Sequence, residues 1–339
     1  MSKSTEKAYH HKSINSRIKA KGLKLEFDNL LTHLHHPNST KEFQESEEPD
    51  AVQVSEYWGK KNDLSKDLKI SFEFYPPRSK VSKQSLKKTY NTLNKINPDY
   101  FSVTFGALGS SQSSTFDTVE NISQETKVPV MPHISCIRMT RVQVIKLLNQ
   151  YKNQGVSQLM VLKGDIPERM LNSGDFTYAT DLVRFIRERY DDFEIHVAAY
   201  PEKHPQSDCV AKDIDFFVDK VHSGATHATT QFFYNSDAYF HFIDELQKRN
   251  IDIPITPGIM PITNFEKLTN FSKTCGAEIP AWILNHLELY KNDSESLIEF
   301  GEDIVNEMCQ KLKQNGVNSF HFYSMNQSEP VLSLSKNLM

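Results

Sequence analysis

The sequence predicts an α/β protein, a (β/α)8 TIM barrel with an N-terminal extension. From residue 69 onward, short runs of β-branched and aromatic residues alternate with longer helical patterns, as in repeated βα units around a parallel sheet. The strand-like runs number eight, which is the count that closes such a barrel, and they occupy about 270 residues, the length it needs. We expect no second domain after the last run.

The first 67 residues differ in composition from the rest of the chain. Basic residues dominate positions 3–24 and acidic residues dominate 42–50, and the segment also holds five histidines. One periodic stretch, 18–34, predicts an amphipathic helix. We therefore expect a charged, partly ordered extension over 1–67, followed by the barrel over 68–339. Solvated side chains are the favoured interpretation of the histidines, with metal ligation as the alternative, because their spacing matches no ligand geometry.

Residue alternation identifies the strands one by one. In the first run, Ile70, Phe72 and Phe74 alternate with polar residues, so one face is apolar and the other polar. The interval before the last strand leaves room for an additional helix near 283–291 and a main helix at 293–314. The expected strands are KISFEF (69–74), YFSVTF (100–105), VPVMPHIS (128–135), QLMVL (158–162), EIHVAAY (194–200), HATTQFF (227–233), IPITPG (253–258) and NSFHFY (318–323).

Composition excludes several classes of protein. Hydrophobic residues make up 38% of the chain and charged residues 24%, which argues against a disordered or collagen-like protein. The net charge of -4 offers no broad attraction to nucleic acid or to an anionic membrane. The four cysteines form no C-x-x-C pair, and neither a membrane-spanning run nor a secretory signal is present. These features predict a cytoplasmic protein with reduced thiols.

Glu73 is the candidate catalytic residue of the first strand. It points to the face opposite three bulky apolar side chains, which in a parallel barrel pack on the outer helices, so we expect its carboxyl group at the barrel mouth. Loss of hydration there would raise its pKa and make it a general acid near neutral pH. A carboxylate paired with an internal Lys or Arg is an equally weighted alternative.

Other polar residues follow strand ends. His133 and Cys136 form an H-x-x-C pair, for which a hydrogen-bonded histidine at the mouth is favoured over metal ligation. The turn VLKGD, 161–165, presents backbone N–H groups and a carboxylate at the rim, although an ordinary turn would read the same. Tyr200 and His204 lie just beyond another strand. No G-x-G-x-x-G follows any strand, so a cofactor would bind at the C-terminal face of the barrel.

Four further residues are weaker candidates. Gln231 lies in an apolar strand, where a buried amide needs partners, and a bound ligand is modestly favoured over a core contact. Asp213 and Lys220 lie about two turns apart on one helix face. A solvated helix face with an apolar stripe is the alternative interpretation of this spacing. Phe271 is a core residue by default.

Together these strand-end motifs resemble the methylenetetrahydrofolate reductase family, in its bacterial type that consists of the catalytic barrel alone. The resemblance covers about 68–338 and rests on ten motifs in order. On this resemblance we expect no S-adenosylmethionine-responsive domain. The motifs are SFEFYPPR, FSVTFGA, PHISC, VLKGD, FTYATDLV, AAYPEKHP, TTQFFY, PGIMPITNF, IPAW and FHFYSMN.

The resemblance implies a flavoenzyme of one-carbon metabolism, a homo-oligomer that uses NADH or NADPH to reduce 5,10-methylenetetrahydrofolate to 5-methyltetrahydrofolate. The two substrates would use one flavin face in turn, giving ping-pong kinetics, and the product would supply methyl groups for methionine synthesis. By the same resemblance, Glu73 is the general acid that protonates N10, and Asp165 stabilises the resulting cation. Gln231, Phe271 and Gln327 would bind folate. Another barrel flavoenzyme, or a folate- or flavin-binding subunit without turnover, is the alternative.

The resemblance also implies bound FAD and no metal. Three substitutions depart from the family pattern at these positions: Lys163 stands for the usual Arg, Phe216 for a polar residue and Phe105 for a common Tyr. At the folate site, Gln327 stands for an Arg. The FAD-binding positions would be Thr104, Ala107, His133, Lys163, Gly164, Asp165, Tyr178, Ala179, Tyr200, His204, Asp213 and Lys220.

Overall fold

The structure is a computed structural model that describes residues 67–105, 112–164 and 174–339, and only the backbone of 112 and 113. The predicted N-terminal extension, 1–67, falls almost wholly outside the described residues. Two predicted site residues, Ala107 and Asp165, also lie outside them.

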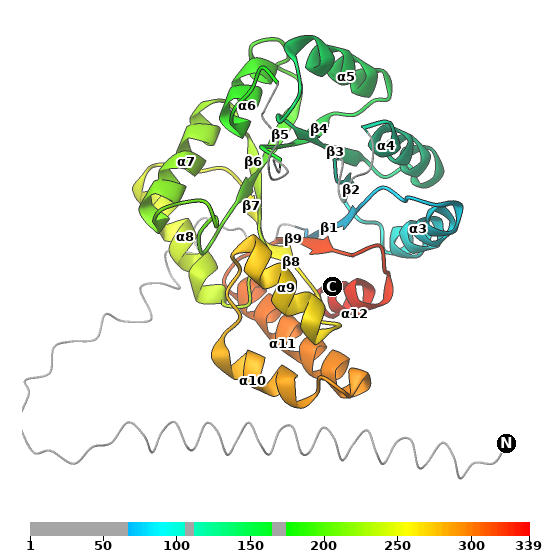
Figure 1. Cartoon of the computed structure of the whole chain (residues 1–339), viewed down its shortest axis with the longest axis vertical. Coiled ribbons are helices and arrows are strands. Elements are labelled where there is room, and N and C mark those ends of the chain that lie inside the picture. The colour runs from blue at the N-terminus through cyan, green and yellow to red at the C-terminus, as the bar shows by residue number, and fades with distance from the viewer. Residues whose placement is uncertain (1–66, 106–111, 165–173) are drawn as a thin grey trace, which may run out of the picture. The chain divides into compact units, whose positions relative to one another are not determined.

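Parallel strands of the described chain form a barrel ringed by helices, which confirms the predicted fold (Figure 1). The strand order is β7-β6-β5-β4-β3-β2-β1-β9-β8, and every pairing is parallel. The strands are β1 Lys69–Phe74, β2 Tyr100–Val103, β3 Val130–Ser135, β4 Gln158–Leu162, β5 Glu194–Ala199, β6 His227–Thr230, β7 Ile255–Thr256, β8 Gly258–Ile259 and β9 Ser319–Tyr323.

The seventh predicted strand is divided at Pro257. Its first part, β7, pairs with β6, and its second part, β8, pairs with β9, so the two together fill one position and close the ring. Proline has no N–H to donate to a ladder, which explains the break. The prediction that the sixth strand runs to Phe233 was too long, because β6 ends at Thr230 and Gln231 follows it.

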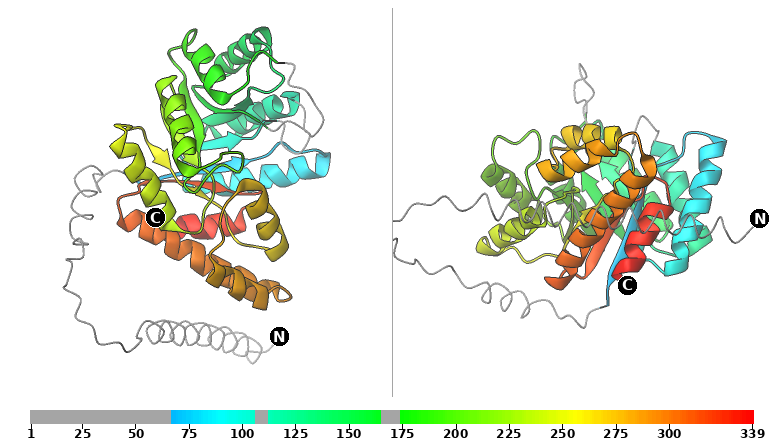
Figure 2. Two further views of the ribbon diagram at one scale, coloured as in Figure 1. Left: turned by 60° about the vertical axis from the view of Figure 1, so that its left-hand side comes forward. Right: turned by 90° about the horizontal axis from the view of Figure 1, so that it is seen from below.

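Helices pack around the outside of this sheet (Figures 1 and 2). The additional helix predicted before the last strand is confirmed as α10, whereas α12 after that strand was not predicted. The helices are α3 Lys80–Leu93, α4 Gln112–Thr126, α5 Arg141–Asn153, α6 Ala179–Arg187, α7 Val210–His222, α8 Ser236–Lys248, α9 Phe265–Cys275, α10 Ala281–Leu289, α11 Ser294–Gln314 and α12 Glu329–Leu338, with a 3-10 turn at Asn94–Ile96.

Alternation along β1 and β2 separates an apolar outer face from a polar face toward the lumen. Phe74 of β1 lies 5.2 Å from the Phe101 ring and 6.5 Å from the Tyr90 ring of α3, so this face packs on the helices. Tyr100 of β2 instead contacts His196 of β5, with ring centroids 5.8 Å apart, although β2 and β5 are not neighbours in the sheet. Such a contact crosses the interior of the barrel, so the polar set lines the lumen.

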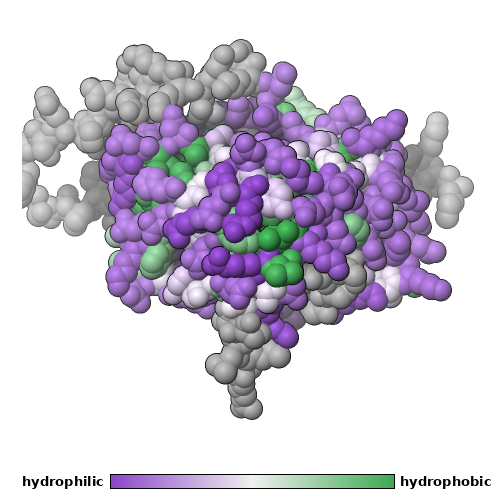
Figure 3. Space-filling view, turned by 90° about the horizontal axis from the view of Figure 1, so that it is seen from above, coloured by the Kyte–Doolittle hydropathy of each residue, from purple (hydrophilic) through white to green (hydrophobic). Residues whose placement is uncertain are grey.

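On the face in Figure 3, hydrophilic residues predominate and the hydrophobic ones form small separate areas. Within the described ranges, no helix combines the length and apolarity needed to cross a membrane. All four cysteines are free thiols.

Candidate active site

Predicted site residues converge at the C-terminal ends of the strands. Thr104, Lys163, Tyr200 and Gln231 each directly follow the last residue of a strand, β2, β4, β5 and β6 respectively. Because parallel strands end at one rim, these four residues share the barrel mouth. Glu73 is the penultimate residue of β1, at the same level.

The Glu73 carboxyl group is held in a water-poor place. Its side chain is 20% exposed, and burial raises its pKa to about 8, so at neutral pH it is largely protonated. Its Oε2 lies 3.5 Å from Nε2 of His133, whose own pKa burial lowers to about 3, assisted by the charge of His196. The two groups are therefore neutral neighbours rather than an ion pair. Among the described residues, no Lys or Arg forms an ion pair with Glu73.

Residues beyond β9 fix the backbone around Glu73. The Ser324 hydroxyl donates to the carbonyl of Glu73 at 2.5 Å. The Asn326 amide bonds Tyr75 in both directions, accepting from its N–H at 3.0 Å and donating to its carbonyl at 2.9 Å. Sequence reasoning missed these roles, although both residues lie in the motif FHFYSMN. They hold the first βα loop against the last one.

Tyr323 is a second residue that sequence reasoning missed. It pairs with Glu73 in the strand register, and its buried hydroxyl donates to the Thr230 carbonyl at 2.7 Å. Burial raises its pKa, and the nearby Glu73 adds to the shift. This phenol therefore stays neutral and adds no negative charge to the mouth.

The turn after β4 packs closely on β3. The Lys163 carbonyl accepts from the Ser135 hydroxyl at 2.9 Å and from the Cys136 thiol at 3.2 Å. Gly164 has φ +83, and a Cβ there would lie 2.0 Å from Oγ of Ser135, so only glycine fits. Cys136 is therefore a buried thiol whose Sγ is bonded to the turn after β4.

A second group surrounds the loop after β5. The Tyr200 and His204 rings meet edge to face with centroids 4.6 Å apart, and the His204 N–H donates to Asp213 at 2.9 Å. Lys220, half-buried on α7, donates from Nζ to the Ala198 carbonyl, and burial lowers its pKa to about 8 while Asp213 opposes that shift. An ammonium group of this kind would gain from an anionic partner.

Glu202 in the same loop was not predicted. Its carboxylate accepts from the Glu278 N–H at 2.8 Å, which ties the loop after β5 to the segment between α9 and α10. Burial raises its pKa to about 7. The motif AAYPEKHP contains this residue but does not reveal its partner.

The remaining predicted positions occupy different surroundings. Tyr178 caps α6 and is exposed, and its ring lies 5.7 Å from Nζ of Lys163, which brings these two together. Ala179 is the first residue of α6. The Gln231 side chain accepts from the next backbone N–H, Phe271 packs half-buried against the core, and Gln327 is exposed in the turn after β9.

Two buried polar atoms at the mouth have no partner among the described residues. They are the Thr104 hydroxyl and Nε2 of His133, the latter 3.5 Å from Glu73 but not aligned for a hydrogen bond. Buried polar groups are normally satisfied by protein, water or a ligand. These two atoms therefore mark the mouth as a place where a polar ligand would be bound.

The sequence of this chain is similar to those of known proteins over most of its length. The family model for methylenetetrahydrofolate reductase matches residues 59–339. The chain is 37% identical over 275 residues to the 5,10-methylenetetrahydrofolate reductase of Buchnera aphidicola from Acyrthosiphon pisum, covering 81% of this chain and 93% of that one. It is 35% identical over 263 residues to the Escherichia coli K12 protein of the same name, covering 77% and 88%.

A solved structure shares the fold at lower identity. A Clostridium thermocellum protein, described as binding two copies of 5-methyl-5,6,7,8-tetrahydrofolic acid, superposes with a TM-score of 0.59 at 17% identity. The match covers 80% of this chain and 94% of that one. At this identity the likeness supports the barrel architecture alone.

Proposed function

The chain belongs to the methylenetetrahydrofolate reductase family, and from that premise we propose that it reduces 5,10-methylenetetrahydrofolate to 5-methyltetrahydrofolate, with bound FAD and with NADH or NADPH as the reductant. The observation that carries the proposal is the position of the Glu73 carboxyl group, which lies largely buried at the barrel mouth 3.5 Å from Nε2 of His133. We also propose the cytoplasm as its location, a homo-oligomer as its assembly and methionine synthesis as the use of its product.

The residues at the mouth fit a flavin. The unpartnered Thr104 hydroxyl and the His133 Nε2 suit the polar edge of a flat ring, and the half-buried Lys220 ammonium suits a diphosphate. When bound, FAD would accept a hydride from NAD(P)H and deliver it to the folate. Lys163 keeps a cation where the family has Arg, as a point charge without the planar fork.

Glu73 would supply the proton that opens the folate ring. Opening the bridged five-membered ring requires protonation at N10, which leaves a cation at N5, and a general acid must hold its proton at neutral pH to do this. A pKa of about 8 meets that requirement. We assign Asp165 to the stabilisation of the resulting cation by its negative charge.

Two further residues would position the folate. The Gln231 amide lies at the rim directly after β6 and would hydrogen-bond the pterin, and Phe271 would stack on it. We also assign Gln327 to the folate site. Because both substrates would need the same ring face, NAD(P)H would leave before folate binds, which gives ping-pong kinetics.

Spectroscopy of the purified protein tests this function. We expect a flavin spectrum that bleaches with NADH or NADPH and recovers when 5,10-methylenetetrahydrofolate is added. Colourless protein that does not bind added FAD would contradict the proposal. Bleaching without recovery would indicate a flavin-binding protein that does not reduce this folate.

A further inference from the structure

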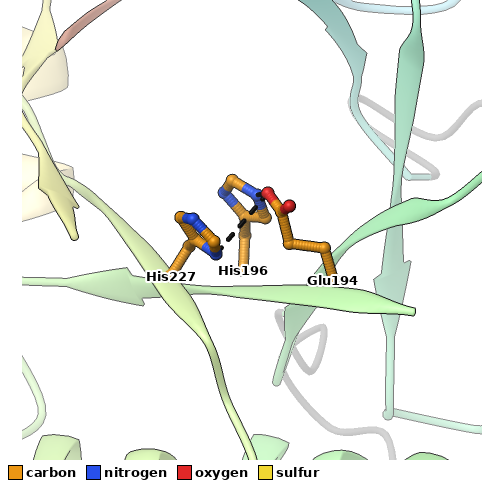
Figure 4. A group of neighbouring side chains, drawn as sticks. All are labelled: Glu194, His196 and His227. Atoms are coloured by element: carbon orange, nitrogen blue, oxygen red, sulfur yellow. Dashed lines mark hydrogen bonds and ion pairs between the residues drawn. The ribbon is translucent and has the colours of Figure 1, made fainter. Parts of the chain in front are cut away.

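Three side chains that the proposed function does not use gather at the opposite end of the barrel (Figure 4). Glu194 is the first residue of β5, His227 is the first residue of β6, and His196 lies two positions beyond Glu194. The strand register places His196 beside His227. Because strands begin at this end, the three face the N-terminal opening of the lumen, away from Glu73.

Their donor atoms lie at the spacing of a metal site. Oε1 of Glu194 is 2.7 Å from Nε2 of His196 and 3.5 Å from Nδ1 of His227, and all three atoms lie within 4.8 Å of one another. Zinc bonds of about 2.0–2.2 Å in a tetrahedral arrangement separate neighbouring donor atoms by roughly 3.3–3.6 Å. The two distances from the Glu194 carboxylate are within about 1 Å of that spacing, and the distance between the two histidine nitrogens depends on how the rings are turned.

We propose that Glu194, His196 and His227 bind a divalent transition metal of the zinc class. Two imidazoles and one carboxylate form a recognised zinc ligand set, with water in the fourth position. Imidazole nitrogen disfavours Ca²⁺ and Mg²⁺, which prefer oxygen. The side chains of Glu194 and His227 are 35% and 31% exposed, so an ion can reach the site from solvent.

Neighbouring side chains support the carboxylate. The Gln158 amide donates to Oε1 of Glu194 at 3.2 Å, which orients the group toward the histidines. His196 is only 3% exposed, and its Nδ1 has no partner among the described residues. In the metal-free state Nε2 of His196 donates to Glu194, so metal binding would shift its proton to Nδ1.

Binding also requires one ring to turn. The two imidazoles stack with centroids 4.8 Å apart and 14° between their planes, and parallel planes cannot both contain one ion. His227 is the ring free to rotate, because it is partly exposed and its contacts are Thr226 and Glu194, whereas His196 is enclosed against Tyr100. The charge of Lys69 acts on both Glu194 and His227 and opposes a bound cation.

Equilibrium dialysis of the full chain with Zn²⁺ tests the site, with Co²⁺ absorption as a second readout. Because the N-terminal extension contains five histidines with imidazole groups of their own, the background is a variant with all five of them replaced by Asn. In that background we expect one equivalent of Zn²⁺ and a tetrahedral Co²⁺ spectrum. His227→Asn and Glu194→Gln should each weaken binding by more than ~100-fold, beyond the 10- to 100-fold typical of losing an outer-shell partner.

Two further variants sharpen the test. Lys69→Gln should tighten Zn²⁺ binding, since it removes a like charge. His241→Ala, an exposed histidine on α8, is the matched control and should change nothing. His227 and Glu194 are partly exposed, so their variants should fold, which circular dichroism checks.

Three results would overturn the proposal. They are no stoichiometric Zn²⁺ in the extension variant, equal affinity in His227→Asn, and loss of binding in His241→Ala. The proposal does not rest on the reductase function, because flavin bleaching by NADH is measured separately at the other end of the barrel. If zinc does not bind, the three side chains form only a hydrogen-bonded network.

Discussion

The two ends of the barrel lumen each hold a glutamate beside a histidine, and the two pairs differ in charge state. At the C-terminal end, burial raises the pKa of Glu73 to about 8 and lowers that of His133 to about 3, so both are neutral. At the N-terminal end, the hydrogen bond from His196 lowers the pKa of Glu194, which remains a carboxylate.

The difference shows that hydrogen bonding and solvent access, rather than residue type, set the protonation state. Glu194 accepts from two side chains and is one-third exposed, whereas Glu73 is four-fifths buried and accepts no aligned side-chain bond from its histidine. Burial of a carboxyl group that accepts no hydrogen bonds costs less free energy when the group is protonated than when it is ionised. One end of the lumen can therefore give a proton, and the other can hold a cation.

The largest expected effect is on the acid itself. Glu73→Gln should slow folate reduction by about 10²- to 10⁴-fold, the usual contribution of a general acid, while flavin bleaching by NADH stays within about twofold. Stopped-flow measurement of the two half-reactions separates them. Glu288→Gln, an exposed glutamate on α10, is the control and should affect neither. Equal loss of both half-reactions in Glu73→Gln would contradict the role of proton donor.

A pH profile tests the same group without mutation. The proposed role makes the protonated form of Glu73 the reactive one, so folate reduction should fall as the pH rises through about 8, approaching tenfold per pH unit above it. Flavin bleaching should lack this limb. The comparison fails if folate reduction stays flat to pH 10, since Glu73 would then not be titrating in that range.

Replacement of Glu73 should change stability and activity in opposite directions. Its pKa is about 8 in the folded state and 4.5 for a glutamate side chain in water, so the folded state binds more protons between these values and stability falls as pH rises through that window. Glu73→Gln removes this loss and should raise the free energy of unfolding by ~1–3 kcal/mol at pH 9, and by almost nothing at pH 4, below the window. Urea unfolding at both pH values measures the difference, and a variant less stable than wild type at pH 9 would refute it.

The smallest effect is expected at the other end. Glu194→Gln loses a charge-assisted bond from His196 and should lower stability by ~1 kcal/mol at pH 7, since partial exposure screens the pair. The folded pKa of Glu194 is depressed, so this contribution is present above the unfolded pKa and disappears as pH falls below it. Urea unfolding in the presence of a chelator gives the value. Stabilisation by this variant at pH 7 would show that the two ends do not differ.

Sequence predicted the fold and the position of Glu73 because both follow from local periodicity. Alternation of Ile70, Phe72 and Phe74 assigns a face to every residue of β1, whatever its neighbours are. The ends of β6 and the break at Pro257 depend on pairing with other strands, which alternation does not report. The α12 helix follows the last strand and contains no sequence motif that would have predicted it.

The N-terminal trio was invisible for a similar reason. His196 and His227 are 31 positions apart, and only the register of β5 with β6 brings them together. A histidine inside a strand resembles any buried polar residue when the strand is considered alone. The roles of Ser324 and Asn326 could likewise not be predicted from the motif FHFYSMN, because their partners lie about 250 positions earlier, on β1 and the loop after it.

The interruption at Pro257 leaves the barrel with a seam. At the position of β7 and β8, side chains replace some of the backbone hydrogen bonds between strands. The Gly258 N–H donates to the Thr230 hydroxyl at 2.9 Å, and the Tyr323 hydroxyl donates to the Thr230 carbonyl. The two-residue strands β7 and β8 contribute fewer backbone hydrogen bonds than the unbroken strands, so local unfolding of the barrel should begin there. The barrel would then open between β6 and β9, while the other strands stay hydrogen-bonded as a curved sheet.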